Sequence, residues 1–516
     1  MFLPGEISPH ARKGDAATRS EKSAEAVVAT VKPSRVRPNL GSLWGREGPN
    51  GKESETHVNL GSRGHQKSGQ LELPFDRQGE TLEICGSGEL RPATNESGRS
   101  GNDGCDLMAA IIERSNVEAA LRRVKKNKGS PGVDGMTTGE LTEHVADHWG
   151  DIREQLLAGV YQPKPVLRRA IPKKGGGVRE LGIPCAIDRV IQQCILQVLQ
   201  PRLDPSFSEH SYGFRPGRSA HHAICAAQRF IQEGRRWVVD VDLEKFFDRV
   251  NHDVLMAKLA RRIEDRRLLG LIRRYLEAGV MALGVTQERH EGTPQGGPLS
   301  PLLANVLLDE IDKELERRGH AFVRYADDCN VYVRSQRAGE RVMASMRKLF
   351  AALRLRINET KSAVARPWDR KFLAYTFKVG EEGTIQRWLA PQALKAMKDR
   401  IRSITRRNGG QSIGDVVRQL KTYLPGWKAY FRLVDTPFIF ELLDGWIRRR
   451  LRALHLKHWK TARRTYRALT HLGLSERKAR GVAACVGSWW KSSGSTLHVV
   501  LNARYFDTLG VPRLKA

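Results

Sequence analysis

Two short apolar runs rich in β-forming residues lie on either side of two adjacent carboxylates. The runs cover residues 322–325 and 330–333, and Asp327 and Asp328 lie between them. This pattern predicts a β-hairpin with both carboxylates at its tip. An ordinary acidic turn would explain an isolated pair, because Asp is a common turn residue. Since adjacent carboxylates repel each other, a tip that holds two of them favours a bound cation.

Residues 237–242 show the alternation of a second β-strand. Val239 and Val241 fall on one face of this strand, and Asp240 and Asp242 fall on the other. A carboxylate at the end of a strand is well placed to hold a metal ion. For Asp240 the alternative is a strand residue that is solvated or paired with a basic side chain.

Helical and strand patterns alternate between about residues 106 and 385, as expected for a mixed domain. Asn251 and Asn116 are each expected to cap the N-terminus of a helix, and the second of these helices should end at Gly129. Residues 1–105 are rich in Gly, Ser, Arg and Glu and lack apolar periodicity. We expect this segment to be mostly disordered, because it cannot bury enough surface to offset chain entropy.

The composition favours a polyanionic partner. The chain has 516 residues, with 87 Lys and Arg against 57 Asp and Glu, a net charge of +30 and a pI near 10.1. Nucleic acid is the leading expected partner, and a solvated basic surface or an anionic membrane surface are the alternatives.

No apolar run reaches the length of a membrane span, and the first residues lack the pattern of a secretory signal, so no membrane association is expected. Seven cysteines without a Cys-x-x-Cys pair favour a reducing compartment and argue against a zinc module. The expected location is the bacterial cytoplasm, in association with the nucleoid, and an organelle is the alternative.

The two acidic segments together predict a reaction. If the strand that ends in Asp242 lies beside the hairpin tip, three carboxylates meet at one point. Carboxylate oxygens with open positions suit Mg²⁺, which takes its other ligands from water and phosphate. Two such ions can activate a 3′-hydroxyl and stabilise a pyrophosphate leaving group. The predicted reaction is nucleotidyl transfer.

Seven blocks of residues occur in an order that resembles the reverse transcriptases encoded by group II introns, the intron-encoded reverse transcriptase/maturases. Residues 325–328 are similar to the catalytic hairpin of that family, and residues 242–248 to its first catalytic segment. The other similar blocks are residues 171–184, 211–219, 292–305, 358–362 and 372–377. The resemblance covers about residues 107–516.

The resemblance implies roles for single residues. Asp242, Asp327 and Asp328 would be catalytic and would bind Mg²⁺. Phe247 would be a steric gate whose ring leaves no room for a ribose 2′-hydroxyl. The residues expected to contact the incoming nucleotide are Lys173, Lys174, Arg179, Phe247, Gln295 and Lys361. For the basic members of this set, a solvated surface position is the alternative.

The segment after Pro391 resembles the maturase-specific thumb, with basic helices and interspersed tryptophans. In one helix Ile447, Leu451 and Leu454 form an apolar stripe, which should leave the neighbouring arginines pointing outwards. The residues expected to bind nucleic acid are Arg215, Arg218, Arg448, Arg449 and Arg452.

One position departs from the family pattern. Ala374 stands where the family usually carries a glycine. An added methyl group fits an extended backbone but resists a positive φ, so a positive φ at this position would lower the efficiency of the polymerase.

The resemblance implies an α+β fold of the right-hand polymerase type, with an α-helical thumb. The implied domains are a disordered extension (1–105), fingers and palm (106–385), a maturase-specific thumb (386–462) and a basic DNA-binding region (463–516). No endonuclease domain is expected at the C-terminus, so a nick, a replication fork or single-stranded DNA would have to supply the primer.

The implied function is RNA-directed DNA synthesis on intron RNA, together with binding of that RNA to assist its splicing. The implied partners are group II intron RNA, a DNA target and primer, and deoxynucleoside triphosphates, and a homodimer remains open. The alternatives are a maturase that only binds RNA for splicing, and a domesticated reverse transcriptase that serves defence or repair.

Overall fold

The computed structural model describes most of the chain after residue 105. The described residues are 106–172, 178–282, 285–287, 291–293, 296–485, 487, 489–494 and 496–515. The segment expected to be disordered, residues 1–105, lies outside them. Helices and three β-sheets make up the described part, which confirms the α+β class. None of the helices described combines the length and the apolar character needed to cross a membrane.

Helices and a small sheet form the first region of the described chain. The sheet has the strand order β2-β1-β4-β5, in which β1 and β2 form an antiparallel hairpin. Its strands are β1 (Val166–Pro172), β2 (Val178–Ile183), β4 (Val280–Ala282) and β5 (Val285–Gln287). The helices are α1 (Leu107–Ile112), α2 (Arg114–Lys126), α3 (Leu141–Leu157), α4 (Ala186–Leu203), α6 (His252–Ala260) and α7 (Arg266–Glu277).

Two expected N-caps have different outcomes. Asn251 accepts a hydrogen bond from the backbone N–H of Val254 at 3.0 Å and caps α6 as predicted. Asn116 lies inside α2, which begins two residues before it. The amide of Asn116 donates instead to the carbonyl oxygens of Ile111 (2.9 Å) and Cys194 (3.2 Å). The predicted helix is therefore present, but its start was placed too late because the cap-type residue is used in a tertiary contact.

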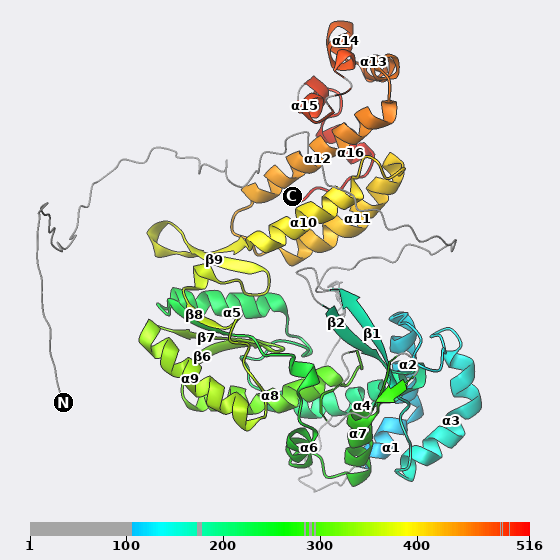
Figure 1. The fold of residues 1–516 in the computed structure, drawn as a ribbon, viewed down its shortest axis with the longest axis vertical. Coiled ribbons are helices and arrows are strands. Elements are labelled where there is room, and N and C mark those ends of the chain that lie inside the picture. Colours follow the sequence, from blue (N-terminus) through cyan, green and yellow to red (C-terminus); the bar gives the residue numbers. More distant parts are fainter. Residues whose placement is uncertain are drawn as a thin grey trace, which may run out of the picture. The chain divides into compact units, whose positions relative to one another are not determined.

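A four-stranded antiparallel sheet with the order β6-β7-β3-β8 forms the centre of the structure. Its strands are β3 (Trp237–Val241), β6 (Ala321–Tyr325), β7 (Asp328–Val333) and β8 (Ala363–Ala365). The helices around it are α5 (Ala220–Gln232), α8 (Ser300–Arg317) and α9 (Gln336–Ala352). The sheet lies between α9 and α5 (Figure 1).

Alternation along the strands decides which side chains face which helix. A Cβ on Gly339 of α9 would lie 2.5 Å from Val364 and 3.5 Å from Val239, so this helix approaches the sheet closely. On the opposite face Tyr332 packs against Phe230 of α5, with ring centroids 5.9 Å apart. Asp240 shares this second face with Tyr332, as the alternation predicts.

The C-terminal region follows a hairpin formed by β9 (Tyr375–Val379) and β10 (Ile385–Leu389). Its helices are α10 (Pro391–Ile404), α11 (Ile413–Tyr430), α12 (Phe438–Trp459), α13 (Ala462–His471), α14 (Glu476–Ala484), α15 (Trp489–Ser493) and α16 (Ala503–Thr508). Short 3-10 helices cover Asp204–Ser206, Phe246–Asp248, Pro367–Asp369, Glu381–Gly383 and Thr496–His498. The stripe of Ile447, Leu451 and Leu454 on α12 is fully buried, as predicted.

Candidate functional site

The strand register brings the predicted carboxylates to one end of the central sheet. Tyr325 pairs with Asp328, so Ala326 and Asp327 form a two-residue turn between β6 and β7. Val241 of β3 pairs with Cys329 of β7, and the next residues beyond that pair are Asp242 and Asp328. Directly opposed side chains on antiparallel strands lie about 5 Å apart at Cβ. Asp242 and Asp328 therefore face each other across two strands, with Asp327 in the adjoining turn.

Asp328 shows that the carboxylates interact. The pKa of Asp328 is raised from 3.8 to about 7 by loss of surrounding water together with the negative charges of Asp327, Asp240 and Asp242. The residue nevertheless keeps an exposed surface. We therefore attribute more of the raised pKa to the neighbouring carboxylates than to burial. A bound cation would relieve this repulsion between the carboxylates.

Backbone contacts hold Asp242 in place. Its N–H donates to Ser362 Oγ at 3.0 Å, and its carbonyl oxygen accepts from the N–H of Asn358 at 2.8 Å. Its carboxylate forms an ion pair with Lys361 Nζ at 2.9 Å. The side chain of Lys361, which the sequence predicted to contact a phosphate, therefore lies beside the carboxylates. It is 63 % exposed and can move away from them.

Asp240 is bound differently from Asp242. Its carboxylate pairs with the guanidinium of Arg370, with the closest N–O distance at 2.6 Å. This is the alternative that the sequence left open for Asp240, a strand residue paired with a base. The sequence reasoning missed Arg370 and also Lys371, whose charge lowers the pKa of Asp328 against the effect of the carboxylates. The two basic residues directly precede the 372–377 block, which is a signal that could have revealed them.

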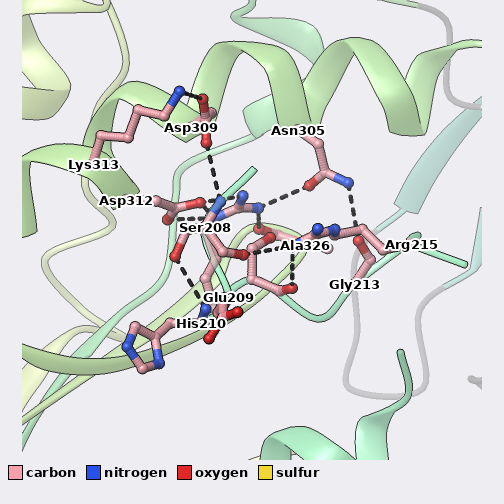
Figure 2. Close-up of polar contacts among 12 residues, drawn as sticks. Ser208, Glu209, His210, Gly213, Arg215, Asn305, Asp309, Asp312, Lys313 and Ala326 are labelled. Carbon is pink, nitrogen blue, oxygen red and sulfur yellow. Dashed lines mark hydrogen bonds and ion pairs between the residues drawn. The ribbon is translucent and has the colours of Figure 1, made fainter. Parts of the chain in front are cut away.

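A buried polar network contacts the turn formed by Ala326 and Asp327 (Figure 2). Arg324 is 1 % exposed and donates to both carboxylate oxygens of Asp312, at 2.8 and 2.9 Å from Nε. Its Nη1 also donates to Asn305 Oδ1 at 2.9 Å and to the carbonyl oxygen of Ala326 at 3.0 Å. Alternation places Arg324 on the face opposite Asp328. One guanidinium thus connects α8 to the turn that carries Asp327.

The turn itself has a constrained backbone. Ala326 has φ +56°, a region that normally favours glycine. Gly213 packs against it so closely that a Cβ there would lie 2.3 Å from the Ala326 nitrogen. The carbonyl oxygen of Gly213 accepts from Asn305 Nδ2 at 3.0 Å, so the packing segment belongs to the same network (Figure 2). The sequence signalled these residues only through their position in similar blocks.

The expected gate residue lies beside the expected nucleotide loop. Phe246 is 3 % exposed and belongs to the core, whereas Phe247 is only half-buried. The carbonyl oxygen of Phe247 accepts from the N–H of Thr293 at 2.7 Å. This hydrogen bond places residues 292–293 beside Phe247. Gln295, Lys173 and Lys174 lie outside the described residues, and of Arg179 only the backbone, in β2, lies within them.

The two arginines expected to bind nucleic acid in the 211–219 block are used internally. Arg215 is 7 % exposed and forms an ion pair with Asp204 at 2.9 Å while donating to the carbonyl oxygen of Ser211 at 3.0 Å. Arg218 is half-buried and donates to the carbonyl oxygen of Glu209. The structure gives no support to a contact of Arg215 with nucleic acid, because its guanidinium bonds to residues of the 204–211 segment.

The expectation that the arginines of α12 point outwards is wrong. Arg448 is 6 % exposed and pairs with Asp444 at 3.1 Å. Arg449 stacks over the Trp490 ring, 4.3 Å from its centroid.

Arg452 of the same helix donates to the carbonyl oxygens of Ser493 (2.8 Å) and Leu501 (3.2 Å), and burial lowers its pKa to about 10. A single apolar stripe predicted one covered face, but α12 is covered by α13, α15 and the C-terminal segment as well.

Ala374 adopts the conformation that the sequence identified as costly. Its φ is +65°, and that of Leu373 is +48°. Side chains other than glycine occupy this left-handed region at a cost. The departure from the family pattern therefore introduces backbone strain directly before β9.

The donor set fits a hard divalent cation by its chemistry, since every candidate ligand is a carboxylate. In the described part of the chain, however, no three acidic, histidine or cysteine side chains are gathered closely enough to hold a metal ion. The positive charge beside Asp242 in this structure is the ammonium group of Lys361.

Two protein families match the chain. Residues 171–377 match the family described as reverse transcriptase (RNA-dependent DNA polymerase), and residues 394–473 match the group II intron, maturase-specific domain. Together the two segments make up more than half of the chain.

Curated relatives agree with these families. The chain is similar to Protein YkfC of Escherichia coli, with 39% identity over 218 residues, which cover 41% of this chain and 57% of that protein. It is similar to the group II intron-encoded protein LtrA of Lactococcus lactis subsp. cremoris, with 29% identity over 325 residues, which cover 49% of this chain and 54% of that protein. The chain thus spans little more than half the length of these relatives.

Among solved structures, a partial Cas6-RT-Cas1–Cas2 complex has a chain with 28% identity and a TM-score of 0.32. The match covers 48% of this chain and 42% of that chain.

The reverse transcriptase segment, the maturase-specific segment and the likeness to an intron-encoded protein support one conclusion. The chain belongs to the family of group II intron-encoded reverse transcriptase/maturases.

Proposed function

We propose that this protein is an RNA-directed DNA polymerase that copies group II intron RNA into DNA and binds that RNA to assist its splicing. The observation that carries the polymerase activity is the register of β3 and β7, which sets Asp242 opposite Asp328 beside the turn of Asp327. A right-hand architecture accompanies the proposal, with fingers and palm in residues 106–385, a thumb in 386–462 and a basic DNA-binding region in 463–516.

Asp242, Asp327 and Asp328 would hold Mg²⁺ in this proposal. The bound cation would supply Lewis-acid stabilisation of the attacking and leaving oxygens. Asp328, whose pKa lies near 7, must lose its proton to serve as a ligand. Lys361 must leave Asp242, and its exposed side chain allows it to move to the triphosphate.

The remaining site residues would select and orient the nucleotide. The half-buried ring of Phe247 would exclude the ribose 2′-hydroxyl, supported by its contact with the segment that leads to Gln295. Lys173, Lys174 and Arg179 would close over the triphosphate from the antiparallel pair β1 and β2 and the residues between them.

The maturase role rests on the matched maturase-specific segment and on the net charge of +30. Splicing is a reaction of the RNA, so the contribution of the protein would be to stabilise the folded RNA. The arginines of α12 are not assigned to this role, because they are bonded within the C-terminal region.

Primer extension tests the proposal. The wild-type protein should make cDNA on an RNA template with a DNA primer in the presence of Mg²⁺ and make none in EDTA. Asp327→Ala should abolish the product while leaving binding of the template in place. A wild-type protein that makes no cDNA but promotes splicing of intron RNA would establish the splicing-only alternative instead.

A further inference from the structure

A second site lies at the other end of the central sheet. A hollow of about 410 Å³ opens where β6 begins and β7 ends. The segments that line it are 318–321, 332–334, the facing side of α9 and Arg235 before β3. Because β6 runs for five residues from Ala321 to Tyr325, the hollow lies about 15 Å from the catalytic turn. It is therefore not part of the carboxylate site.

The lining of this hollow is strongly basic. Its titratable and charged side chains are Arg235, Arg318, Arg334, Arg341 and His320, together with the phenol of Tyr332, and none of the described carboxylates lines it. We call it the arginine-lined hollow. Burial lowers the pKa of His320, and the charge of Arg318 adds to that effect, so the arginines are the lasting source of positive charge.

Two of the four arginines already have partners. Arg318 forms an ion pair with Glu314 at 2.6 Å, and Arg235 forms one with Glu233. Arg334 and Arg341 are exposed, and within the part of the chain that the structure describes neither side chain forms a hydrogen bond or an ion pair. Two guanidinium groups thus face the hollow with their donors available to a ligand.

We propose that the arginine-lined hollow binds phosphate groups and that its ligand is the backbone of the intron RNA. Paired guanidinium groups recognise phosphate oxygens through parallel hydrogen bonds, which makes arginine the residue suited to this chemistry. The volume accommodates a nucleotide-sized group. The exposure of Arg334 and Arg341 favours a chain that passes over the site rather than a small molecule enclosed within it. The inference rests on the proposed function, which supplies the RNA.

Salt-dependent binding of group II intron RNA to the full-length protein tests this inference. The variant Arg334→Glu/Arg341→Glu should bind about tenfold more weakly, and its plot of log affinity against log salt should be shallower by about 1.5, for two lost phosphate contacts. The matched control is Arg354→Glu, an exposed arginine beyond the far end of α9 that does not line the hollow. It should keep both the affinity and the slope.

Each outcome decides the question. Unchanged affinity and slope in the double variant would overturn the inference, and so would an equal loss in the Arg354→Glu control, since a general loss of charge would then explain it. If inorganic pyrophosphate raises the melting temperature of the wild type but not of the double variant, while RNA affinity is equal, the ligand is a free polyphosphate and the assignment to RNA is wrong.

Primer extension separates this inference from the proposed function. Both variants should extend a DNA primer at the wild-type rate, because the hollow lies at the opposite end of the strands from the carboxylates. If the double variant extends the primer normally and its salt slope of RNA binding is unchanged, the proposed phosphate site is wrong and the proposed polymerase activity stands. If the wild-type protein does not extend the primer, the proposed polymerase activity is wrong, whatever the arginine-lined hollow binds.

Discussion

Arg324 carries a buried positive charge beside the turn formed by Ala326 and Asp327. It binds Asp312 with two oxygen contacts, reaches Asn305 on the same helix and donates to the carbonyl oxygen of Ala326. The planar guanidinium makes all of these bonds at once, which an ammonium group cannot do. Because the turn has a strained φ at Ala326, a fixed donor at its carbonyl oxygen helps to hold the position of Asp327.

Arg324→Lys should therefore impair catalysis more than binding. Lysine keeps the charge opposite Asp312 but cannot also reach Asn305 and Ala326 in the same geometry. We expect kcat for single-nucleotide addition to fall by about 10- to 100-fold, as for a small misplacement of a reacting group, with little change in the KM for the nucleotide. Steady-state kinetics on an RNA template check this, with melting temperature measured in parallel. A rise in KM alone, or a kcat equal to that of the wild type, would show that Arg324 does not position the turn.

Asp328 predicts a pH dependence of stability in the absence of metal. Its pKa in the folded protein is about 7, against 3.8 ordinarily. Between these values the folded state binds the proton more tightly than the unfolded state, so stability falls as pH rises through this window. Asp328→Asn removes the titrating group. In EDTA, the variant should gain in melting temperature relative to the wild type as pH rises from about 5 to 8. A difference that does not change with pH would contradict the interaction among the carboxylates.

At the scale of elements, the sequence predicted the strands of the site well. Two apolar runs rich in β-forming residues located β6 and β7, and the alternation of apolar and acidic side chains, with a period of two, located β3. The faces of Asp240 and Asp242 followed from the same period. The start of α2 was missed because Asn116, a residue typical of caps, bonds to Cys194 instead of capping.

What the sequence could not predict depends on neighbours that are distant along the chain. The inward bonds of Arg448 and Arg452 require Asp507, Ser493 and Leu501 to lie beside α12, and no local period encodes that. The network of Arg324 joins strand and helix residues in the same way. The resemblance identified the carboxylates, but only the register of β3 and β7 brings Asp242 to Asp328.

The strained turn before β9 gives a prediction at this scale. Ala374→Gly should stabilise the protein by about 1 kcal/mol, because glycine adopts a positive φ without the steric cost that alanine bears. Urea unfolding measures the change. The matched control is Ala365→Gly in β8, where an extended backbone gives glycine no such advantage and a loss is expected. Equal effects at the two positions would show that Ala374 is not strained.

At the scale of the whole molecule, the central sheet separates two kinds of charge. Carboxylates gather at the end of β3 and β7 where the turn of Asp327 lies, and arginines gather at the other end of β6 and β7. The first arrangement suits a divalent cation and a reacting phosphate, and the second suits a phosphate that is only bound. A polymerase that also holds a folded RNA needs both.

Single-nucleotide addition to a DNA primer on an RNA template, compared between Asp327→Asn and Asp240→Asn, tests the central claim most directly. Both changes remove one carboxylate charge from the same end of the sheet, but Asp240 is paired with Arg370 and is not a proposed ligand. The account predicts a loss of at least about 100-fold in kcat for Asp327→Asn, with template binding retained, and a loss below about tenfold for Asp240→Asn. Comparable activity of the two variants, or an active Asp327→Asn, would contradict it.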